Sequence, residues 1–248
     1  MKLTLISATY NSATSVKTCL DSIVSQDYGF LEYLIIDGKS SDDTLNIVKD
    51  YQQKFPFIKL ISKKDHGIYD ALNKGINLAS GDIIGFVHSD DFLASKGIIN
   101  NIVSMITSKN LDGVYGDLQY VDKLNTQKVI RNWKSCDFIP GLLEQGWMPP
   151  HPTLFLKKEV YEKHGLFDLS YKISADYDFM LRIFKDTELK FGYLPKVVTK
   201  MRVGGASNRS LKNIIKKSKE DYRAIRSNNV GNFLTLIKKN TSKLKQFF

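Results

Sequence analysis

The stretch IIGFVHSDD, residues 83–91, joins an apolar run to a pair of adjacent carboxylates. The run Ile83–Val87 has the composition of a short buried strand, and Asp90 and Asp91 follow it closely. Paired acids at the end of a buried strand suit a hard divalent cation such as Mg²⁺ or Mn²⁺, which prefers carboxylate oxygens. The alternative is a turn that caps a helix beginning at Phe92. The neighbouring segments decide between these two interpretations.

Similar apolar runs recur along the first hundred residues and alternate with helical patterns. The predicted strands are Leu3–Ala8, Tyr33–Ile36, Ile58–Ile61 and Ile83–Val87. The first predicted helix starts near Ser12, and the second runs from Asp42 to Phe55 with Ser41, Asp42 and Asp43 as candidate caps. The third runs from Ile68 to Ala79 and has one apolar face, formed by Ile68, Ala71, Leu72, Ile76 and Ala79. Repeated strand-helix units predict an α/β fold with a doubly wound, mostly parallel sheet flanked by helices. Ligands of such sheets bind beyond the carboxyl ends of the strands.

Polar residues follow each predicted strand and would gather at one edge of this sheet. They are Thr9-Tyr10-Asn11, Asp37-Gly38-Lys39-Ser40, Asp65-His66-Gly67 and His88-Ser89-Asp90-Asp91. The chain contains neither GxGxxG nor GxxxxGK[ST], which argues against a dinucleotide-type or P-loop phosphate cradle. A metal ion and basic side chains would therefore have to neutralise a bound phosphate.

The second half of the chain is less regular. Residues 114–121 and 128–133 are predicted as paired strands, in an antiparallel arrangement, and the irregular segment GLLEQGWMPPHPT (141–153) follows them. The segment ISADYDFMLRIF, Ile173–Phe184, predicts a helix with Asp176 in its first turn. An acid at that position also suits the helix dipole, so a structural role for Asp176 is the alternative to a chemical one.

Six segments, in this order, resemble the family-2 inverting glycosyltransferases with a GT-A fold, and more narrowly the bacterial members that build capsular, colanic acid-like or O-antigen polysaccharides. The segments are ISATYNS (6–12), SIVSQDY (22–28), IIDGKSSDDT (35–44), DHGIYDALNKGINLASGD (65–82), VHSDD (87–91) and ISADYDFMLRIF (173–184). The resemblance implies a GT-A catalytic domain over residues 1–205, with a nucleotide-binding half at 1–110 and an acceptor half at 111–205.

The resemblance also implies that a nucleotide-sugar donor binds at the strand ends. Thr9, Tyr10 and Asn11 would line the base. Asp37 would accept a hydrogen bond from the base, and Asp65 would add to the same pocket.

The family's metal signature usually reads Asp-any-Asp-Asp and aligns here with His88-Ser89-Asp90-Asp91. Asp90 falls on the metal-binding acid and Asp91 on the next one, which implies a Mn²⁺ or Mg²⁺ cofactor. His88 replaces the first aspartate, and its imidazole can donate to a ribose hydroxyl. The family's histidine near the lid has no counterpart in MRVGGAS (201–207), which leaves Arg202 and the turn at Gly204–Gly205 to assist metal binding or lid closure.

The family's Glu-Asp acceptor motif aligns with Ala175 and Asp176, so the glutamate is replaced and the aspartate is kept. Inverting sugar transfer is a single displacement at the anomeric carbon, which requires a base for the acceptor hydroxyl and an electrophile for the departing diphosphate. Asp176 is the implied base, with Asp178 as the next candidate, and the cation supplies the electrophile. His151 lies where the family has acceptor-side residues, and Trp147 is a candidate for stacking on a sugar. Each also suits a packing role.

Positive charge is concentrated at the end of the chain. Residues 200–248 contain 13 Lys and Arg against 2 acids, whereas the first 199 residues contain 23 and 24. Residues 206–248 are predicted as a basic extension of two amphipathic helices. Leu211, Ile214, Ile215, Tyr222 and Ile225 form one apolar face, and Val230, Phe233, Leu234, Ile237, Leu244 and Phe248 form the other, with Lys238, Lys239, Lys243 and Lys245 elsewhere. Such a helix suits an anionic membrane surface. The alternative is that the first helix packs on the catalytic body and the second on a partner subunit, in a homodimer.

The predicted function is transfer of a sugar from a UDP-linked donor to a growing glycan or a lipid-linked acceptor. A nucleotidyltransferase is the alternative enzyme class, but it would normally have a Gly-rich phosphate loop near the N-terminus, and this chain has no such loop. A basic nucleic-acid-binding protein would explain the charge, but acids at four strand ends would repel phosphate, so no nucleic-acid partner is expected.

No apolar run approaches the ~20 residues of a membrane span, and MKLTLISATYN meets polar residues too soon for a secretory signal. These features predict a cytoplasmic location, peripheral on the inner face of the membrane.

Overall fold

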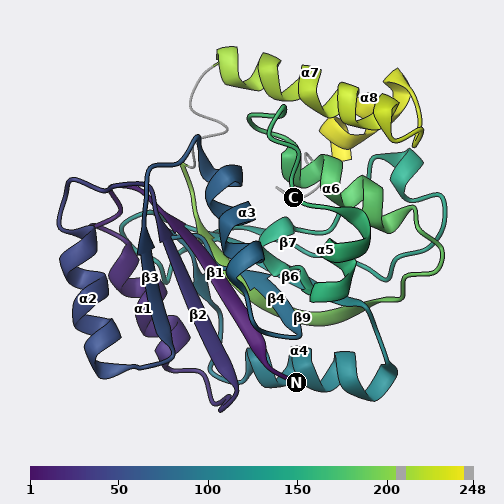
Figure 1. The fold of residues 1–248 in the computed structure, drawn as a ribbon. Helices are drawn as coiled ribbons and strands as arrows, with labels where there is room; N and C mark the ends of the chain where they lie inside the picture. Colours follow the sequence, from purple (N-terminus) through teal and green to yellow (C-terminus); the bar gives the residue numbers. More distant parts are fainter. Residues whose placement is uncertain (205–210, 243–248) are drawn as a thin grey trace.

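The computed structural model describes residues 1–204 and 211–242, which form a nine-stranded sheet covered by helices on both faces (Figure 1). The strands are β1 (Leu3–Thr9), β2 (Leu31–Asp37), β3 (Ile58–Ser62), β4 (Ile83–Phe86), β5 (Phe92–Leu93), β6 (Gly113–Val121), β7 (Val129–Trp133), β8 (Phe155–Lys157) and β9 (Phe191–Arg202). The α-helices are α1 (Val16–Val24), α2 (Thr44–Lys54), α3 (Ile68–Leu78), α4 (Ile98–Lys109), α5 (Lys158–His164), α6 (Ala175–Phe184), α7 (Leu211–Ser227) and α8 (Phe233–Ser242). Two short 3₁₀ helices, η1 (Leu143–Gln145) and η2 (His151–Thr153), precede β8. Within the described ranges, no helix is long and apolar enough to cross a bilayer.

The N-terminal part of the sheet consists of parallel strands in the order β3-β2-β1-β4. The sheet then continues through β8, β6, β9 and β5, with parallel and antiparallel pairs mixed. The α/β prediction of a doubly wound sheet is confirmed, and the two strands predicted at 114–121 and 128–133 are the antiparallel pair β6 and β7. The predicted division at residue 110 falls between α4 and β6, and the sheet runs on across it.

Both faces of the sheet carry a hydrophobic core, because successive side chains of a strand point to opposite sides. On β2, Leu34 and Ile36 pack in the core that contains α3 and α6, whereas Tyr33 and Ile35 pack in the core that contains α1 and α4. Helices α3 and α6 therefore lie on the same face, although about a hundred residues separate them in the chain. This arrangement brings the start of α6 toward the ends of the parallel strands.

Two local predictions require correction. Asp43 is the N-cap residue of α2 but makes no capping hydrogen bond, and the carboxylate of Asp42 instead accepts bonds from the backbone N–H and the hydroxyl of Thr44, at 3.0 and 2.5 Å. Ile68, predicted on the buried face of α3, is 46% exposed. It is the first residue of the helix and lies at the open edge of the sheet, while Leu72 and Ile76 further along are buried.

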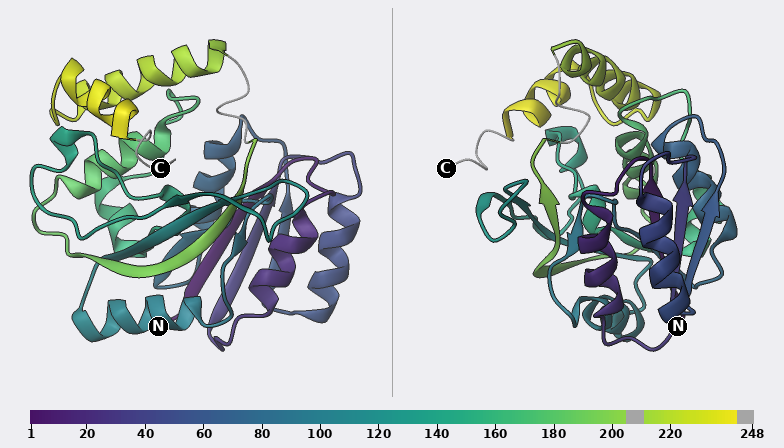
Figure 2. Two further views of the ribbon diagram at one scale, coloured as in Figure 1. Left: turned by 180° about the vertical axis from the view of Figure 1, so that it is seen from behind. Right: turned by 90° about the vertical axis from the view of Figure 1, so that its left-hand side faces the viewer.

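The extension formed by α7 and α8 packs at one end of the molecule, beside α6 (Figure 2). Its predicted apolar faces are partly wrong. Ile214 and Ile215 are exposed, and α7 packs instead through its C-terminal half, where Ala224 and Ile225 are fully buried. On α8, Phe233, Leu234 and Ile237 are exposed, whereas Thr235 and Leu236 face inward. The side chain of Leu211 and the predicted positions 205–207, Lys243, Leu244, Lys245 and Phe248 lie outside the described structure.

Lys239, predicted to lie off the apolar face of the second helix of the extension, is 1% exposed. Its Nζ lies 2.5 Å from Oδ2 of Asp221 and 3.7 Å from the centroid of the Tyr177 ring, and Nζ of Lys217 lies 2.6 Å from the same oxygen. Burial would raise the pKa of Asp221, but the two ammonium groups outweigh it and hold that pKa at about 2. A buried ion pair therefore joins α8 to α7 and, through the Tyr177 ring, to α6.

We predict that Asp221→Asn lowers the free energy of unfolding at pH 7 by about 3 kcal/mol, because it leaves the buried ammonium of Lys239 without its counter-charge. Urea denaturation measures this change. Because the native pKa of Asp221 is depressed, its stabilisation is present above the ordinary pKa of 3.8 and disappears as the pH falls toward about 2, so the difference should shrink over that interval. Lys238→Ala, at the exposed neighbouring position, is the control and should change nothing. Equal stability of Asp221→Asn and the wild type at pH 7 would contradict the assignment.

Candidate active site

The carboxyl ends of β1, β2 and β4 bring the predicted donor-side residues together at one edge of the sheet. Thr9 and Asp37 are register partners on β1 and β2, and the Thr9 hydroxyl donates to Asp37 at 3.0 Å. The hydroxyls of Ser12 and Ser89 lie 2.9 Å apart and join the segment after β1 to the segment after β4. The strand ends therefore form a continuous polar rim.

Asp37 is fully buried at this rim and accepts several hydrogen bonds from the protein. Its donors are the hydroxyls of Thr9, Ser40 and Ser62 and the backbone N–H groups of Lys39 and Ser40. Burial would raise the pKa of Asp37, but the bonds from Ser40 and Ser62 outweigh it and hold that pKa below its usual range. Because a carboxylate has about four lone-pair positions, a bond to a nucleotide base would require one of these donors to be displaced.

Tyr10 and Asn11 differ in how free their side chains are. The side-chain amide oxygen of Asn11 accepts the backbone N–H of Ser41 at 2.9 Å, and the backbone N–H of Asn11 donates to the Ser40 hydroxyl at 2.9 Å. Asn11 thus ties the loop after β1 to the loop after β2, with a left-handed φ of 48°. The Tyr10 ring is 66% exposed and is available to stack on a planar ligand.

Asp65 follows β3 and packs against Gly38. A Cβ atom on Gly38 would lie 2.5 Å from Oδ2 of Asp65, so the close approach of these two loops depends on the missing side chain. The other Asp65 oxygen accepts the backbone N–H of Gly67 at 3.0 Å. Asp65 therefore lies beside the loop that holds Asp37, as the predicted shared pocket requires.

The two adjacent acids after β4 have different environments. Asp90 is exposed, whereas Asp91 is 1% exposed and accepts the backbone N–H of Arg202 at 3.3 Å. Burial and the neighbouring Asp90 raise the pKa of Asp91 well above its usual range. The Arg202 guanidinium donates to the Asp90 carbonyl and lies 5.3 Å from the centroid of the Phe92 ring. Asp90, Asp91 and Arg202 therefore lie together at the rim.

These residues fit a hard divalent cation that is held largely by its substrate. The described part of the chain contains no group of three or more metal-ligating side chains. Mg²⁺ commonly takes one or two carboxylates from a protein and completes its shell with water and phosphate oxygens. Asp90 could supply such a carboxylate directly. Asp91 would have to turn out of its buried position to act as a second ligand.

His88 and His151 lie side by side beneath this rim, with ring centroids 6.1 Å apart. The His151 ring also packs on Phe86, at 5.5 Å. Burial lowers the pKa of both imidazoles, that of His151 to about 4, while the charge of Asp176 opposes the shift in each. Asp90 opposes it in His88 as well. His88 is thus within electrostatic range of both Asp90 and Asp176, and the low pKa of His151 leaves its ring neutral at pH 7.

Asp176 occupies the first turn of α6 and is half-buried. The Tyr69 hydroxyl of α3 lies 3.0 Å from its Oδ1 and 2.6 Å from the carbonyl oxygen of Ile173. Burial and the charge of Asp176 raise the pKa of Tyr69 well above its usual range, so the phenol keeps its proton as a donor. Sequence reasoning missed Tyr69. Its spacing of three and seven residues from Leu72 and Ile76 was the available signal that it faces inward.

Trp147 is part of an aromatic cluster. Its ring lies 5.7 Å from Tyr115, 5.5 Å from Phe138 and 5.6 Å from Phe184, measured between centroids. The indole is half-buried among these rings. These contacts give Trp147 the packing role that was the alternative to sugar stacking.

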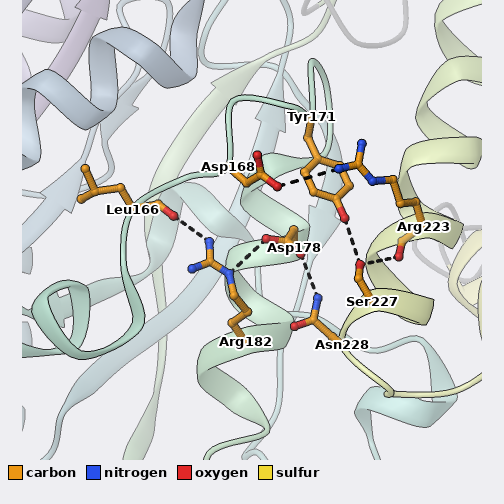
Figure 3. A pocket seen from close by; sticks show the side chains of 8 residues that line it. All are labelled: Leu166, Asp168, Tyr171, Asp178, Arg182, Arg223, Ser227 and Asn228. Atoms are coloured by element: carbon orange, nitrogen blue, oxygen red, sulfur yellow. Dashed lines mark hydrogen bonds and ion pairs between the residues drawn. The ribbon is translucent and has the colours of Figure 1, made fainter.

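Asp178, the alternative base, lines a separate pocket between α6 and α7 (Figure 3). Nε of Arg182 lies 3.0 Å from one of its carboxylate oxygens, and the Asn228 amide lies 2.8 Å from the other. The side chain is 5% exposed. Both oxygens are engaged in structural contacts, which leaves Asp176 as the better placed of the two acids.

Comparisons with known proteins identify the family and the fold of the chain. The profile of the family described as "Glycosyl transferase family 2" matches residues 4–165. The PGL/p-HBAD biosynthesis glycosyltransferase of Mycobacterium bovis (strain BCG / Pasteur 1173P2) is 30% identical over 206 residues, which cover 82% of this chain and 78% of that protein.

Two solved structures share the fold. S. aureus TarS 1–349 in complex with UDP-GlcNAc superposes with a TM-score of 0.71 at 19% identity, over 93% of this chain and 66% of that one. The mannosyltransferase PcManGT from Pyrobaculum calidifontis, in complex with GDP-Man and Mn²⁺, superposes with a TM-score of 0.66 at 18% identity, over 98% of this chain and 74% of that one. The chain spans 39% of the longer TarS chain.

The match of the family profile over most of the chain and the 30% identity to a curated relative confirm the central part of the resemblance. The solved structures confirm the GT-A type of sheet. The chain is a glycosyltransferase and belongs to glycosyl transferase family 2.

Proposed function

We propose that this glycosyltransferase inverts the anomeric centre and transfers a hexosyl or N-acetylhexosaminyl group from a UDP-linked donor to a glycan or lipid-linked acceptor, in the assembly of capsular or O-antigen-type polysaccharide. The observation that carries the proposal is geometric: the hydroxyl of Tyr69 on α3 lies 3.0 Å from Oδ1 of Asp176, and the ring of His88, two residues before Asp90, lies 6.1 Å from the ring of His151. The strand end that suits a metal-bound diphosphate and the acid that suits an acceptor hydroxyl therefore share one site. TarS, whose fold this chain shares, was solved with UDP-GlcNAc.

Asp176 is proposed to deprotonate the acceptor hydroxyl. It is half-buried at the N-terminal end of α6, and the Tyr69 phenol orients one of its oxygens. The other oxygen then faces the acceptor and takes its proton as the hydroxyl attacks the anomeric carbon. No covalent enzyme intermediate is needed, because inversion is a single displacement.

The departing nucleoside diphosphate is proposed to be neutralised at the Asp90 rim. A Mn²⁺ or Mg²⁺ ion held by Asp90 would supply Lewis-acid charge there. Arg202 lies beside Asp90 and brings a permanent positive charge to the same edge. Tyr10 is proposed to stack on the base, while Asp37 and Asp65 shape the base pocket through the loops that they hold. His88 and Ser89 are proposed to face the ribose and the sugar.

The acceptor is proposed to approach from the side of α6 and η2. His151 in η2 is 6% exposed and packs on Phe86, so we propose that it forms the floor of this side, with Trp147 supporting the wall.

The exposed residues Phe233, Leu234 and Ile237, beside the exposed Lys238, are proposed to contact an anionic lipid surface at the inner face of the membrane. A homodimer through the same face is the alternative.

Asp90→Asn should abolish the metal-dependent part of UDP-sugar binding, because a neutral amide oxygen is a poorer ligand for a hard cation. Calorimetric titration of the donor, with and without Mn²⁺, measures this part. Asp50→Asn, at an exposed position on α2, is the matched control and should bind the donor as the wild type does. A normal metal response in Asp90→Asn would exclude Asp90 as the ligand.

Asp176→Asn should lower kcat by about 100-fold or more while donor affinity is nearly unchanged, as loss of a general base does. The amide oxygen can still accept the Tyr69 hydrogen bond, so the local geometry is retained. Single-turnover transfer and donor titration separate the two effects. Asp178→Asn should reduce stability but leave kcat of the folded enzyme near the wild-type value. The base would be reassigned if the two variants showed the reverse pattern.

The substitutions Leu234→Gln and Ile237→Gln together should weaken sedimentation with anionic vesicles, because they remove apolar contacts from the exposed face of α8. Electrostatic binding is screened by salt, so wild-type sedimentation should fall steeply at high ionic strength. Leu124→Gln, on the 93% exposed residue of the β6–β7 hairpin, is the control for loss of surface hydrophobicity. If the wild-type enzyme sedimented equally with neutral and anionic vesicles, the exposed face of α8 would be assigned to a homodimer instead. Light scattering would detect that dimer.

A further inference from the structure

Glu220 of α7 reaches across to the segment that precedes α6. Its Oε2 accepts the backbone N–H groups of Lys172, Ile173 and Ser174, at 3.0, 2.8 and 3.1 Å. The Glu220 side chain is buried, with 9% of the residue exposed. Ser174 is the N-cap residue of α6, so its N–H group has no partner within the helix, and the N–H groups of Lys172 and Ile173 precede the helix. One carboxylate oxygen of α7 therefore anchors three consecutive peptides at the start of α6.

The same segment is held from the opposite direction by α3. The carbonyl oxygen of Ile173 lies 2.6 Å from the Tyr69 hydroxyl, which lies 3.0 Å from Asp176. The peptide groups of Ile173 are thus bonded to Glu220 through N–H and to Tyr69 through C=O. Ser174, which also donates to Glu220, is the N-cap residue of α6, and its carbonyl accepts the Asp178 N–H at 3.0 Å. A shift of this segment would therefore move the first turn of α6, where Asp176 lies.

The docking of α7 has other supports. Asp221 forms ion pairs with Lys217 and Lys239, and Ala224 and Ile225 are fully buried. These contacts join α7 to α8 and to the core around α6, and they do not involve residues 172–174. Glu220 is therefore separable by mutation from the general attachment of the helix.

We propose that Glu220 is a positioning residue for catalysis, which fixes the segment Lys172–Ser174 and thereby holds Asp176 in line with the acceptor hydroxyl. The C-terminal extension then completes the active site as well as covering the catalytic body. This inference rests on the proposed role of Asp176 as the base.

The test compares Glu220→Gln and Glu220→Ala with the wild type in the full-length enzyme. A displacement of the base by about 1 Å can cost up to about 100-fold in rate. We expect kcat to fall about 10-fold in Glu220→Gln, which keeps one acceptor oxygen, and further in Glu220→Ala, while KM for the donor stays within about twofold. A purely structural role would lower the melting temperature without this ordered loss of kcat and its partial rescue by Gln.

A double-mutant cycle ties the effect to the base. In the Asp176→Asn background, Glu220→Gln should reduce the residual rate little further, because the effects of residues that act through one hydrogen-bond network are not additive. Full additivity of the two losses would overturn the proposal. Normal kcat in both Glu220 variants, together with an inactive Asp176→Asn, would overturn it while leaving the proposed function intact. A fully active Asp176→Asn would instead remove the proposed base.

Two controls address charge and docking. Glu162→Gln removes a negative charge from an exposed position on α5 and should leave kcat unchanged. Asp221→Asn loosens α7 without touching residues 172–174, and it should keep kcat within about twofold of the wild type at a temperature where it is fully folded. If Asp221→Asn lost as much kcat as Glu220→Gln, general docking of the helix would explain the effect and the proposal would fail.

Discussion

The parallel pairing of β1 with β2 and β4 is the constraint on which the site depends. The register sets Thr9 opposite Asp37 and Ile6 opposite Phe86, so the segments that follow all three strands emerge at one edge. A slip of one residue would exchange the two faces of a strand and put its core residues into the wrong layer. With apolar cores on both faces, that error would be costly at every position of β2. The geometry of the polar rim is therefore fixed by hydrophobic packing well away from it.

The acids of this protein fall into two groups according to their partners. Asp37 and Asp221 are buried, strongly bonded and held charged by hydroxyls or ammonium groups, and they serve the fold. Asp90 is exposed at the rim, and Asp176 is half-buried with a single tyrosine partner, so each retains oxygens for a ligand. Residue type alone does not separate these groups. Burial and the donors already bound separate them, because a buried carboxylate whose charge is already stabilised by protein groups gains little from a substrate.

The sequence was sufficient for features that depend on local pattern. Runs of four to six residues rich in Ile, Leu and Val predicted β1 to β4, and the polar residues after them predicted the rim. It was insufficient for contacts between distant segments. Tyr69 and Asp176 are 107 residues apart, and Glu220 reaches a segment 46 to 48 residues before it. Lys239 was placed off the apolar face of its helix by the spacing of the apolar residues. Its burial depends on Asp221 one helix earlier and on the Tyr177 ring, neither of which helical periodicity can reveal.

The residues of the proposed site fall into two groups, those inside the region matched by the family profile and those beyond it. The matched region, residues 4–165, contains the strand ends, the loops around Asp37 and the acids at Asp90 and Asp91. Asp176, Arg202 and Glu220 all lie beyond it. The family profile therefore covers the strand ends and His151, whereas the placement of the acid proposed as the base depends on how α6 packs against α7. The extension meets that helix at its N-terminal end, where a small change in packing is converted directly into a change in the direction of a carboxylate.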